Sequence, residues 1–250
     1  SDQASVNAGV TQGTKLGPIL FLIMINDTCN DSEVPYFKYV DDLTLVESRK
    51  GNQPPKLQRV LNDFNEWSLE NNMTLNPTKC FVMTVCFSKN PAIPIPLSIG
   101  DKILNSVNKA KILGITIQSD LKWDSHVSEL MKRCNKKLYM IRCLKRYKLP
   151  LFDLITVYSG YLRPILDYGV PVFNGNLTKD NCRLLESIQK RACRIMLGKR
   201  CKRMRKLLKC APWKPLMTDV KNYVQTLPQA CQKIHFVVNG YLLLTILVTT

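Results

Sequence analysis

Residues 34–46, VPYFKYVDDLTLV, place two adjacent carboxylates, Asp41 and Asp42, between two short apolar runs. This pattern predicts a strand, a tight turn and a second strand. Asp-Asp is an unusual choice for a purely structural hairpin, because turns with positive φ at both central residues favour glycine. Two touching carboxylates also repel each other, and a hard divalent cation such as magnesium relieves that repulsion. We therefore treat the pair as a candidate metal site.

A solvated turn is the competing interpretation of Asp41-Asp42. Asp-Asp pairs are common, and a short motif taken alone has a high false-positive rate. The flanking sequence has to decide between the two.

The charge of the chain restricts the class of partner. A formal net charge of +17 over 250 residues creates an attractive field for a polyanion, either nucleic acid or an acidic membrane surface. The ten cysteines are irregularly spaced, without a Cys-x-x-Cys pair and without a signal peptide near Ser1, which favours reduced thiols in an intracellular, non-secreted protein. With two histidines, a zinc finger is not expected. The chain does not begin with Met, and we expect a piece of a longer protein.

Upstream of the carboxylates, residues 9–18, GVTQGTKLGP, precede the apolar run 19–25. Glycines permit close backbone approach to a ligand, and Pro18 suits the first turn of a helix. The loop lacks the spacing of a P-loop or of a dinucleotide-binding fingerprint.

The order and spacing of these motifs resemble the reverse transcriptases of non-LTR (LINE-type) retrotransposons. The resemblance combines the loop Gln12-Gly13-x-x-x-Gly17-Pro18, a helix ending near Asn26-Asp27, and Tyr39-Val40-Asp41-Asp42. It implies that Asp41 and Asp42 bind magnesium (or manganese) in the polymerase palm, that Gln12 and Gly13 line the pocket for nucleotide and template, and that Tyr39 lies beneath the primer terminus.

Two further segments continue the predicted palm. A helix follows from the apolar residues Leu57, Val60, Leu61, Phe64 and Trp67, which recur at helical spacing, stop at Asn71-Asn72 and would pack beneath the sheet. A strand is predicted over residues 81–87, and the resemblance gives Lys79, just before it, a role in assisting the leaving pyrophosphate. A solvated lysine at the start of a strand is the alternative.

Residues 97–104 predict a hairpin with Gly100-Asp101 as its turn. Residues 109–117 follow and resemble the last palm motif of the family, which supports the end of the primer. Gly114, inside this predicted strand, indicates a close backbone approach, for which a primer contact and a β-bulge are equally good explanations.

From about Asp124 the apolar period changes from strand to helix. We predict three helices: one from Asp124, one interrupted at Pro164, and one that begins at the N-cap Thr178 and ends at Gly198. The resemblance makes them a thumb and extends over about residues 9–198. The basic run 190–214 predicts a phosphate-binding segment, a solvated tail or a targeting signal. The apolar stretch 234–250 is open to four interpretations: a changed reading frame, a decayed copy, a buried helix or a membrane anchor.

The fold class that follows is α+β, with a partial palm over residues 1–122, a helical thumb over 123–200 and an unassigned tail over 201–250. The implied reaction is RNA-directed DNA synthesis with an RNA template, a DNA primer and deoxynucleoside triphosphates, in the nucleus or cytoplasm and without a membrane partner. The family needs another aspartate from an earlier palm strand, and nothing before Gly9 supplies it, so we expect these 250 residues alone to be inactive. A non-catalytic nucleic-acid-binding remnant is the alternative.

Overall fold

The computed structural model describes residues 13–49, 55–86, 96–198 and 241–248. The chain forms two compact units: Ser1–Ala110 together with Val238–Thr250, and Lys111–Val237. Each unit is described by itself below.

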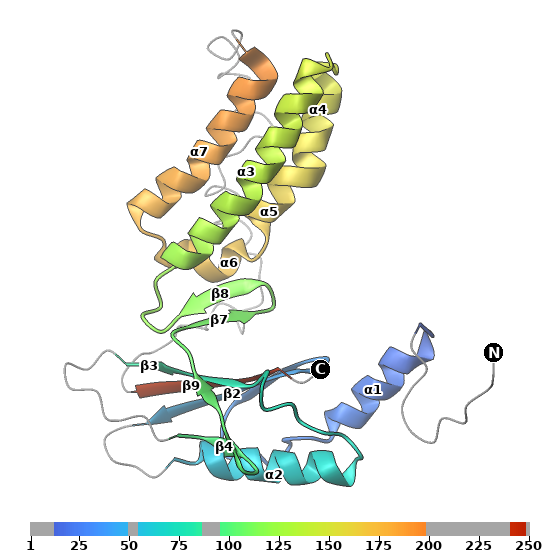
Figure 1. The fold of residues 1–250 in the computed structure, drawn as a ribbon, viewed down its shortest axis with the longest axis vertical. Coiled ribbons are helices and arrows are strands. Elements are labelled where there is room, and N and C mark those ends of the chain that lie inside the picture. The colour runs from blue at the N-terminus through green and yellow to red at the C-terminus, as the bar shows by residue number, and fades with distance from the viewer. Residues whose placement is uncertain (1–12, 50–54, 87–95, 199–240, 249–250) are drawn as a thin grey trace. The chain divides into compact units, whose positions relative to one another are not determined.

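A five-stranded sheet forms the centre of the first unit (Figure 1), in the order β1-β2-β9-β3-β6. Its strands are β1 (Tyr36–Tyr39), β2 (Asp42–Arg49), β3 (Phe81–Val85), β6 (Asn105–Ser106) and β9 (Tyr241–Val248). β9 is antiparallel to both β2 and β3, whereas β3 and β6 are parallel. The central strand of the sheet therefore comes from the far end of the chain.

The helix α2 (Leu57–Glu70) covers one face of this sheet (Figure 1). Its apolar stripe packs with the inward side chains of β2 and β3 in one core that includes Leu43, Leu45, Leu61, Phe64 and Val82. Asn71 follows as the C-cap and Asn72 has a φ of 54°, so the predicted helix, its end and its position beneath the sheet are confirmed. The predicted hairpin is confirmed as β4 (Ser98–Ile99) and β5 (Lys102–Ile103).

Helix α1 (Leu16–Asn26) follows the glycine-containing loop and ends at the C-cap Asp27, as predicted. It is apolar along its whole length, yet only Gly17 and Ile25 are buried. Most of its large side chains are therefore exposed in this chain.

The second unit is mainly helical (Figure 1). Its elements are the hairpin β7 (Lys109–Ile112) and β8 (Ile115–Gln118), the helices α3 (Asp124–Arg146), α4 (Leu151–Val157), α5 (Arg163–Asp167), α6 (Val170–Phe173) and α7 (Lys179–Leu197), a π-helix (Tyr158–Leu162) and a 3-10 turn (Asn174–Asn176). β7 begins two residues before the boundary between the units. A single apolar core joins α3 to α7 and includes Leu130, Ile141, Tyr158, Phe173 and Ile188.

The ends of α7 confirm the prediction made from its capping residues. Thr178 is the N-cap, and its hydroxyl accepts a hydrogen bond from the Asn181 amide at 3.2 Å. Gly198 is the C-cap and has a φ of 54°. The predicted interruption of the second helix takes the form of a π-helix, Tyr158–Leu162, between α4 and α5. Pro164 lies in the first turn of α5, directly after the π-helix, where a missing amide hydrogen does not break a helical hydrogen bond.

The C-terminal apolar stretch contains a strand, so a buried helix over Tyr241–Val248 is the wrong interpretation. An extended conformation satisfies the backbone here, because both neighbours in the sheet offer hydrogen-bonding partners along the strand. Among the described residues, no helix combines the length and hydrophobicity required to cross a membrane. The basic run beyond Gly198 lies outside the described residues.

Candidate active site

The two aspartates lie at the loop of the β1–β2 hairpin, which confirms the predicted strand, turn and strand. Tyr39 pairs with Asp42, so Val40 and Asp41 form a two-residue loop. Of these two, only Val40 has a positive φ, at 56°. A β-branched residue in this region is strained by about 1–3 kcal/mol, and such strain concentrates at functional sites.

The Asp42 carboxyl lies in an electrostatic environment that disfavours its charged form. Partial burial raises the pKa of the Asp42 carboxyl, and the neighbouring Asp41 carboxylate raises it further. A bound cation would oppose both effects, because it favours the ionised form. Paired carboxylate oxygens are the ligands that magnesium and manganese prefer, so the donor chemistry fits such an ion. Within the described part of the chain, no group of three or more His, Cys, Asp or Glu side chains is placed to hold a metal.

The sheet brings Lys79 and Asp42 to the same end. Asp42 is opposite Val248 of β9, and Phe81, at the start of β3, is opposite Ile246 of the same strand. β2 and β3 therefore run in the same direction about 10 Å apart, with one strand between them. Lys79 lies two residues before Phe81 and is exposed.

The nucleotide-binding loop predicted from sequence is described only in part. Gln12 lies outside the described residues. Gly13 has a φ of 90°, which favours glycine, and a Cβ there would contact nothing within 4 Å. The Gly17 amide donates to the Thr14 hydroxyl at 3.1 Å, so the loop closes onto the start of α1.

Tyr39 ends β1 beside the aspartates and is 61% exposed. A large aromatic side chain exposed next to two carboxylates offers a contact surface at the edge of the candidate metal site.

Gly114 lies in the second unit, and the structure corrects its expected setting. The predicted continuous strand is a hairpin, and Leu113 and Gly114, with φ of 45° and 81°, form its turn. A β-bulge is therefore the wrong explanation. The close approach is to Tyr168: a Cβ at Gly114 would lie 3.3 Å from its ring, and its hydroxyl donates to the Leu113 carbonyl at 2.6 Å.

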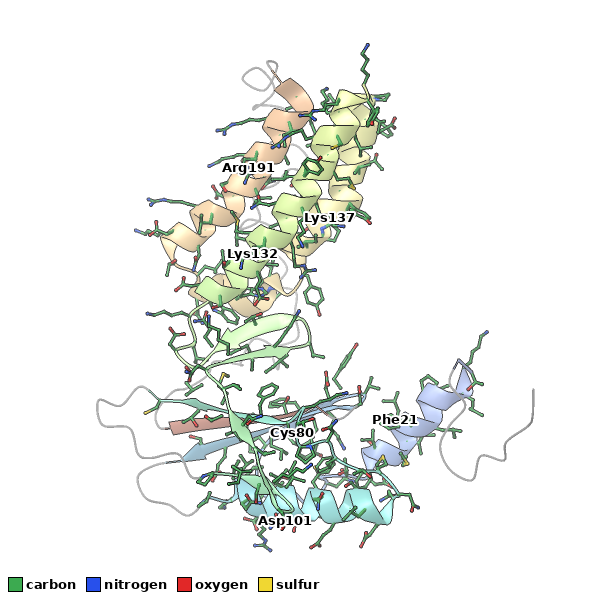
Figure 2. The ribbon with its side chains drawn as sticks, in the orientation of Figure 1. Phe21, Cys80, Asp101, Lys132, Lys137 and Arg191 are labelled. Carbon is green, nitrogen blue, oxygen red and sulfur yellow. The ribbon has the colours of Figure 1, made fainter. Side chains whose placement is uncertain are left out.

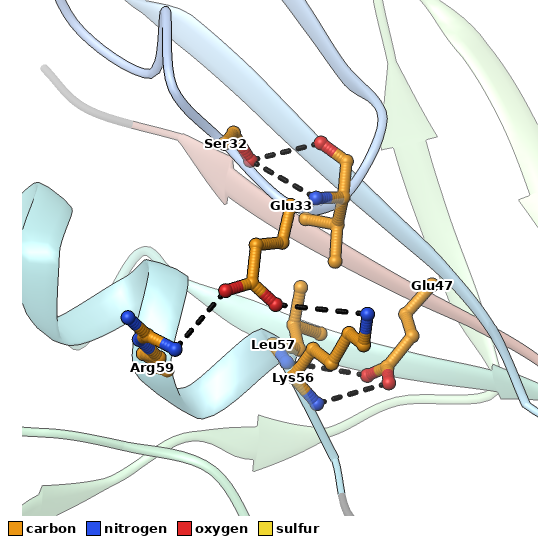
Figure 3. A network of polar contacts seen from close by, with 7 residues as sticks. Ser32, Glu33, Glu47, Lys56, Leu57 and Arg59 are labelled. Carbon is orange, nitrogen blue, oxygen red and sulfur yellow. Dashed lines mark hydrogen bonds and ion pairs between the residues drawn. The ribbon is translucent and has the colours of Figure 1, made fainter.

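A buried carboxylate, which the sequence analysis did not single out, holds β2 on α2 (Figure 3). Glu47 is 5% exposed and accepts hydrogen bonds from the amides of Lys56 at 3.0 Å and Leu57 at 3.3 Å. These amides open α2, where a negative charge is favourable. The only sequence signal is a charged residue at an inward position of an alternating strand.

Basic side chains extend from the helices of the second unit. Figure 2 labels Lys132 and Lys137 on α3 and Arg191 on α7. Lys137 Nζ lies 3.9 Å from the centroid of the Tyr161 ring, and Arg191 donates to the Asn135 side chain at 2.8 Å. These contacts hold cations at the surface of the helices.

Comparison with known proteins shows which family the segment that carries this site resembles. Residues 2–117 match the family model described as reverse transcriptase (RNA-dependent DNA polymerase). The chain is 28% identical over 207 residues to the probable RNA-directed DNA polymerase from transposon X-element of Drosophila melanogaster, an alignment that covers 79% of this chain and 22% of the relative. It is 24% identical over 249 residues to the RNA-directed DNA polymerase from mobile element jockey of the same species, which covers 95% of this chain and 25% of the relative.

Residues 2–117, which include both aspartates, thus match a reverse transcriptase domain. The chain is homologous to the RNA-directed DNA polymerases of LINE-type, non-LTR retrotransposons, as the sequence motifs predicted. It spans about a quarter of the length of these curated relatives, 22% and 25%. No solved structure gives a match.

Proposed function

We propose that this chain is part of an RNA-directed DNA polymerase in which the primer 3′-hydroxyl attacks the α-phosphate of a deoxynucleoside triphosphate opposite an RNA template. The adjacent carboxylates Asp41 and Asp42 at a hairpin loop, inside the segment that matches the reverse transcriptase family, carry this proposal. The first unit then corresponds to part of the palm and the helices of the second unit to the thumb.

In this proposal Asp41 binds a divalent ion directly, and Asp42 binds it less directly or shapes the field. Magnesium or manganese held by these carboxylates would supply activation of the attacking hydroxyl and stabilisation of the leaving oxygens. Lys79, at the same end of the sheet as Asp42, stabilises the departing pyrophosphate.

The remaining predicted residues contact the substrates. Gln12 and Gly13 line the nucleotide and template pocket, Tyr39 supports the primer terminus, and Gly114 lies in the segment that supports the primer. The positive φ of the turn explains the glycine at position 114 without a bound substrate. In this proposal the segment around Gly114 contacts the primer, and that contact does not require residue 114 to lack a side chain.

Primer extension on an RNA template with magnesium and all four deoxynucleotides tests the proposal. A longer polypeptide that adds the upstream palm strand should extend the primer, and Asp41→Asn should abolish extension. Asp101→Asn, in the exposed turn of the β4–β5 hairpin, is the matched control and should retain it. Since the family needs a further aspartate, the 250 residues alone should give no product. Robust synthesis by Asp41→Asn would contradict the role of the hairpin.

The second candidate is a nucleic-acid-binding remnant without catalysis. The net charge of +17 and the surface cations of α3 and α7 favour it. Binding of an RNA–DNA duplex should then weaken steeply with salt, because cations on the protein release counterions from phosphates. Lack of binding even at low salt would exclude this candidate.

A further inference from the structure

The side chain of Lys38, on β1, forms hydrogen bonds with backbone carbonyls at the C-terminal end of helix α1. Its ammonium donates to the carbonyls of Ile25 at 3.2 Å, Asn26 at 3.0 Å and Thr28 at 2.8 Å. An ammonium has three hydrogens, and three carbonyls accept from it here. Its Nζ also lies 5.1 Å from the centroid of the Tyr36 ring.

Two of these carbonyls, those of Ile25 and Asn26, belong to the last turn of α1, and Thr28 follows directly after the C-cap Asp27. The last four carbonyls of a helix carry a partial negative charge, which a cation stabilises. α1 has no basic residue of its own in its last turn. Lys38 supplies that charge from a different element.

The rest of α1 contributes little to fixing its direction. Ile25, close to the Lys38 contacts, is 8% exposed and is the one large apolar side chain of α1 in the core. Five others are exposed by 44% or more: Leu16, Ile19, Leu20, Leu22 and Ile23. α1 is therefore fastened mainly at the end that Lys38 holds.

We infer that Lys38 is a positioning residue that couples the Asp41–Asp42 hairpin to α1 and, through it, to the loop at Gly13. Lys38 is three residues before Asp41 on the hairpin strand, and the loop opens the other end of α1. An 11-residue helix is about 16 Å long, so a modest tilt at its held end displaces the loop by several ångströms. The inference rests on the proposed function in that it takes the loop to contact the nucleotide.

The test compares three variants of the 250-residue chain. Lys38→Met keeps a long unbranched side chain and removes the ammonium, whereas Lys38→Arg retains charge and donors. Lys102→Met, on the exposed strand β5 of the same unit, is the control for loss of one positive charge. Amide exchange in α1, in α2 and in the loop at Gly13, and binding of a fluorescent deoxynucleoside triphosphate with manganese, are measured for each.

Lys38→Met should accelerate amide exchange along α1 by about tenfold, because it removes several charge-assisted hydrogen bonds. Exchange in α2 should stay unchanged, nucleotide affinity should fall severalfold, and Lys38→Arg should restore both quantities. Exchange in α1 no faster than in Lys102→Met would overturn the inference. Faster exchange with unchanged nucleotide affinity would also overturn it, since Lys38 would then only cap a helix.

Failure of the proposed function gives a different result. If the unsubstituted chain binds no nucleotide, the nucleotide pocket is contradicted, and amide exchange in α1 and in the loop at Gly13 decides the coupling. Equal exchange in the Met and Arg variants would then overturn it, as would faster exchange confined to α1, whereas faster exchange in both α1 and the loop in Lys38→Met would support it.

Discussion

Glu47 and His126 are buried polar residues, and each accepts hydrogen bonds from backbone amides of a neighbouring element. Glu47, on β2, is bonded to the first amides of α2. His126, on α3, is 2% exposed, and its Nδ1 accepts from the Thr116 amide of β8 at 3.3 Å. Because an unpaired buried polar group is costly, both residues should be sensitive to changes in charge.

Replacing Glu47 with Gln should lower the free energy of unfolding of the first unit by about 1–3 kcal/mol. Gln has nearly the same shape as Glu, so the decrease in the free energy of unfolding measures the effect of the negative charge at the start of α2 and not a change in packing. Urea unfolding monitored on α2 measures it. Glu66→Gln, exposed in the same helix, should change the free energy little, and equal effects of the two substitutions would contradict the capping role.

The second unit should lose stability in mildly acid solution through His126. Burial lowers the pKa of its imidazole most, Glu129 raises it, and Arg133 and Lys111 lower it. The unfolded chain therefore binds a proton more readily than the folded unit. Stability is fully present above the ordinary pKa of about 6.5 and falls as the pH drops toward the lowered folded value.

Thermal unfolding of the second unit between pH 5 and 8 measures this dependence. His126→Gln keeps a hydrogen-bond acceptor but does not titrate, so it should flatten the curve over this range. An unchanged slope in that variant would assign the pH dependence to other groups.

At the scale of elements, the turn of the β7–β8 hairpin packs against a second turn, at Tyr168 and Gly169. The turn at Gly114 packs against Tyr168, and a Cβ at Gly169 would lie 2.5 Å from the Ile115 side chain. Gly169 has a φ of 68°. Both turns therefore need glycine, for their backbone conformation and for the close approach of the opposite side chain.

Gly114→Ala should destabilise the second unit by about 1–2 kcal/mol, because an L-residue is strained at positive φ. The Tyr168 ring, 3.3 Å from the new Cβ, would also have to move. Thermal unfolding measures the effect. Gly160→Ala, in the π-helix with open space around it, is the control and should be neutral or stabilising. A neutral Gly114→Ala would show that the turn adapts without cost.

At the scale of the whole molecule, the first unit depends on residues from both ends of the chain. β9 lies between β2 and β3 and pairs with both, so it joins the two halves of the sheet that carries Asp42. The second unit has its own core and does not include this strand.

Ending the chain after Gly240 should therefore affect the two units differently. Amide protection in β2 and β3 should fall sharply, because each strand loses the partner on one edge. Protection in α3 and α7 should remain, and hydrogen exchange of the truncated and full chains measures both. Unchanged protection in β2 and β3 would show that the sheet does not require β9.

The sequence by itself determined the hairpin of Asp41 and Asp42, helix α2 with its stop at Asn71, and α7 with its caps Thr178 and Gly198. Local signals specify these features, because apolar period and capping residues act within a few positions. The motif order also identified the reverse transcriptase relatives.

Only the tertiary structure decided which strand completes the sheet, what surrounds Gly114 and how Lys38 holds α1. Apolar alternation cannot name a partner strand, and a glycine or lysine does not reveal which distant group approaches it. Such contacts depend on residues far apart in sequence that meet only when the chain is folded. For the candidate active site, the position of the two carboxylates at a hairpin could therefore be predicted from the sequence, whereas the contacts that hold this hairpin against α1 could not.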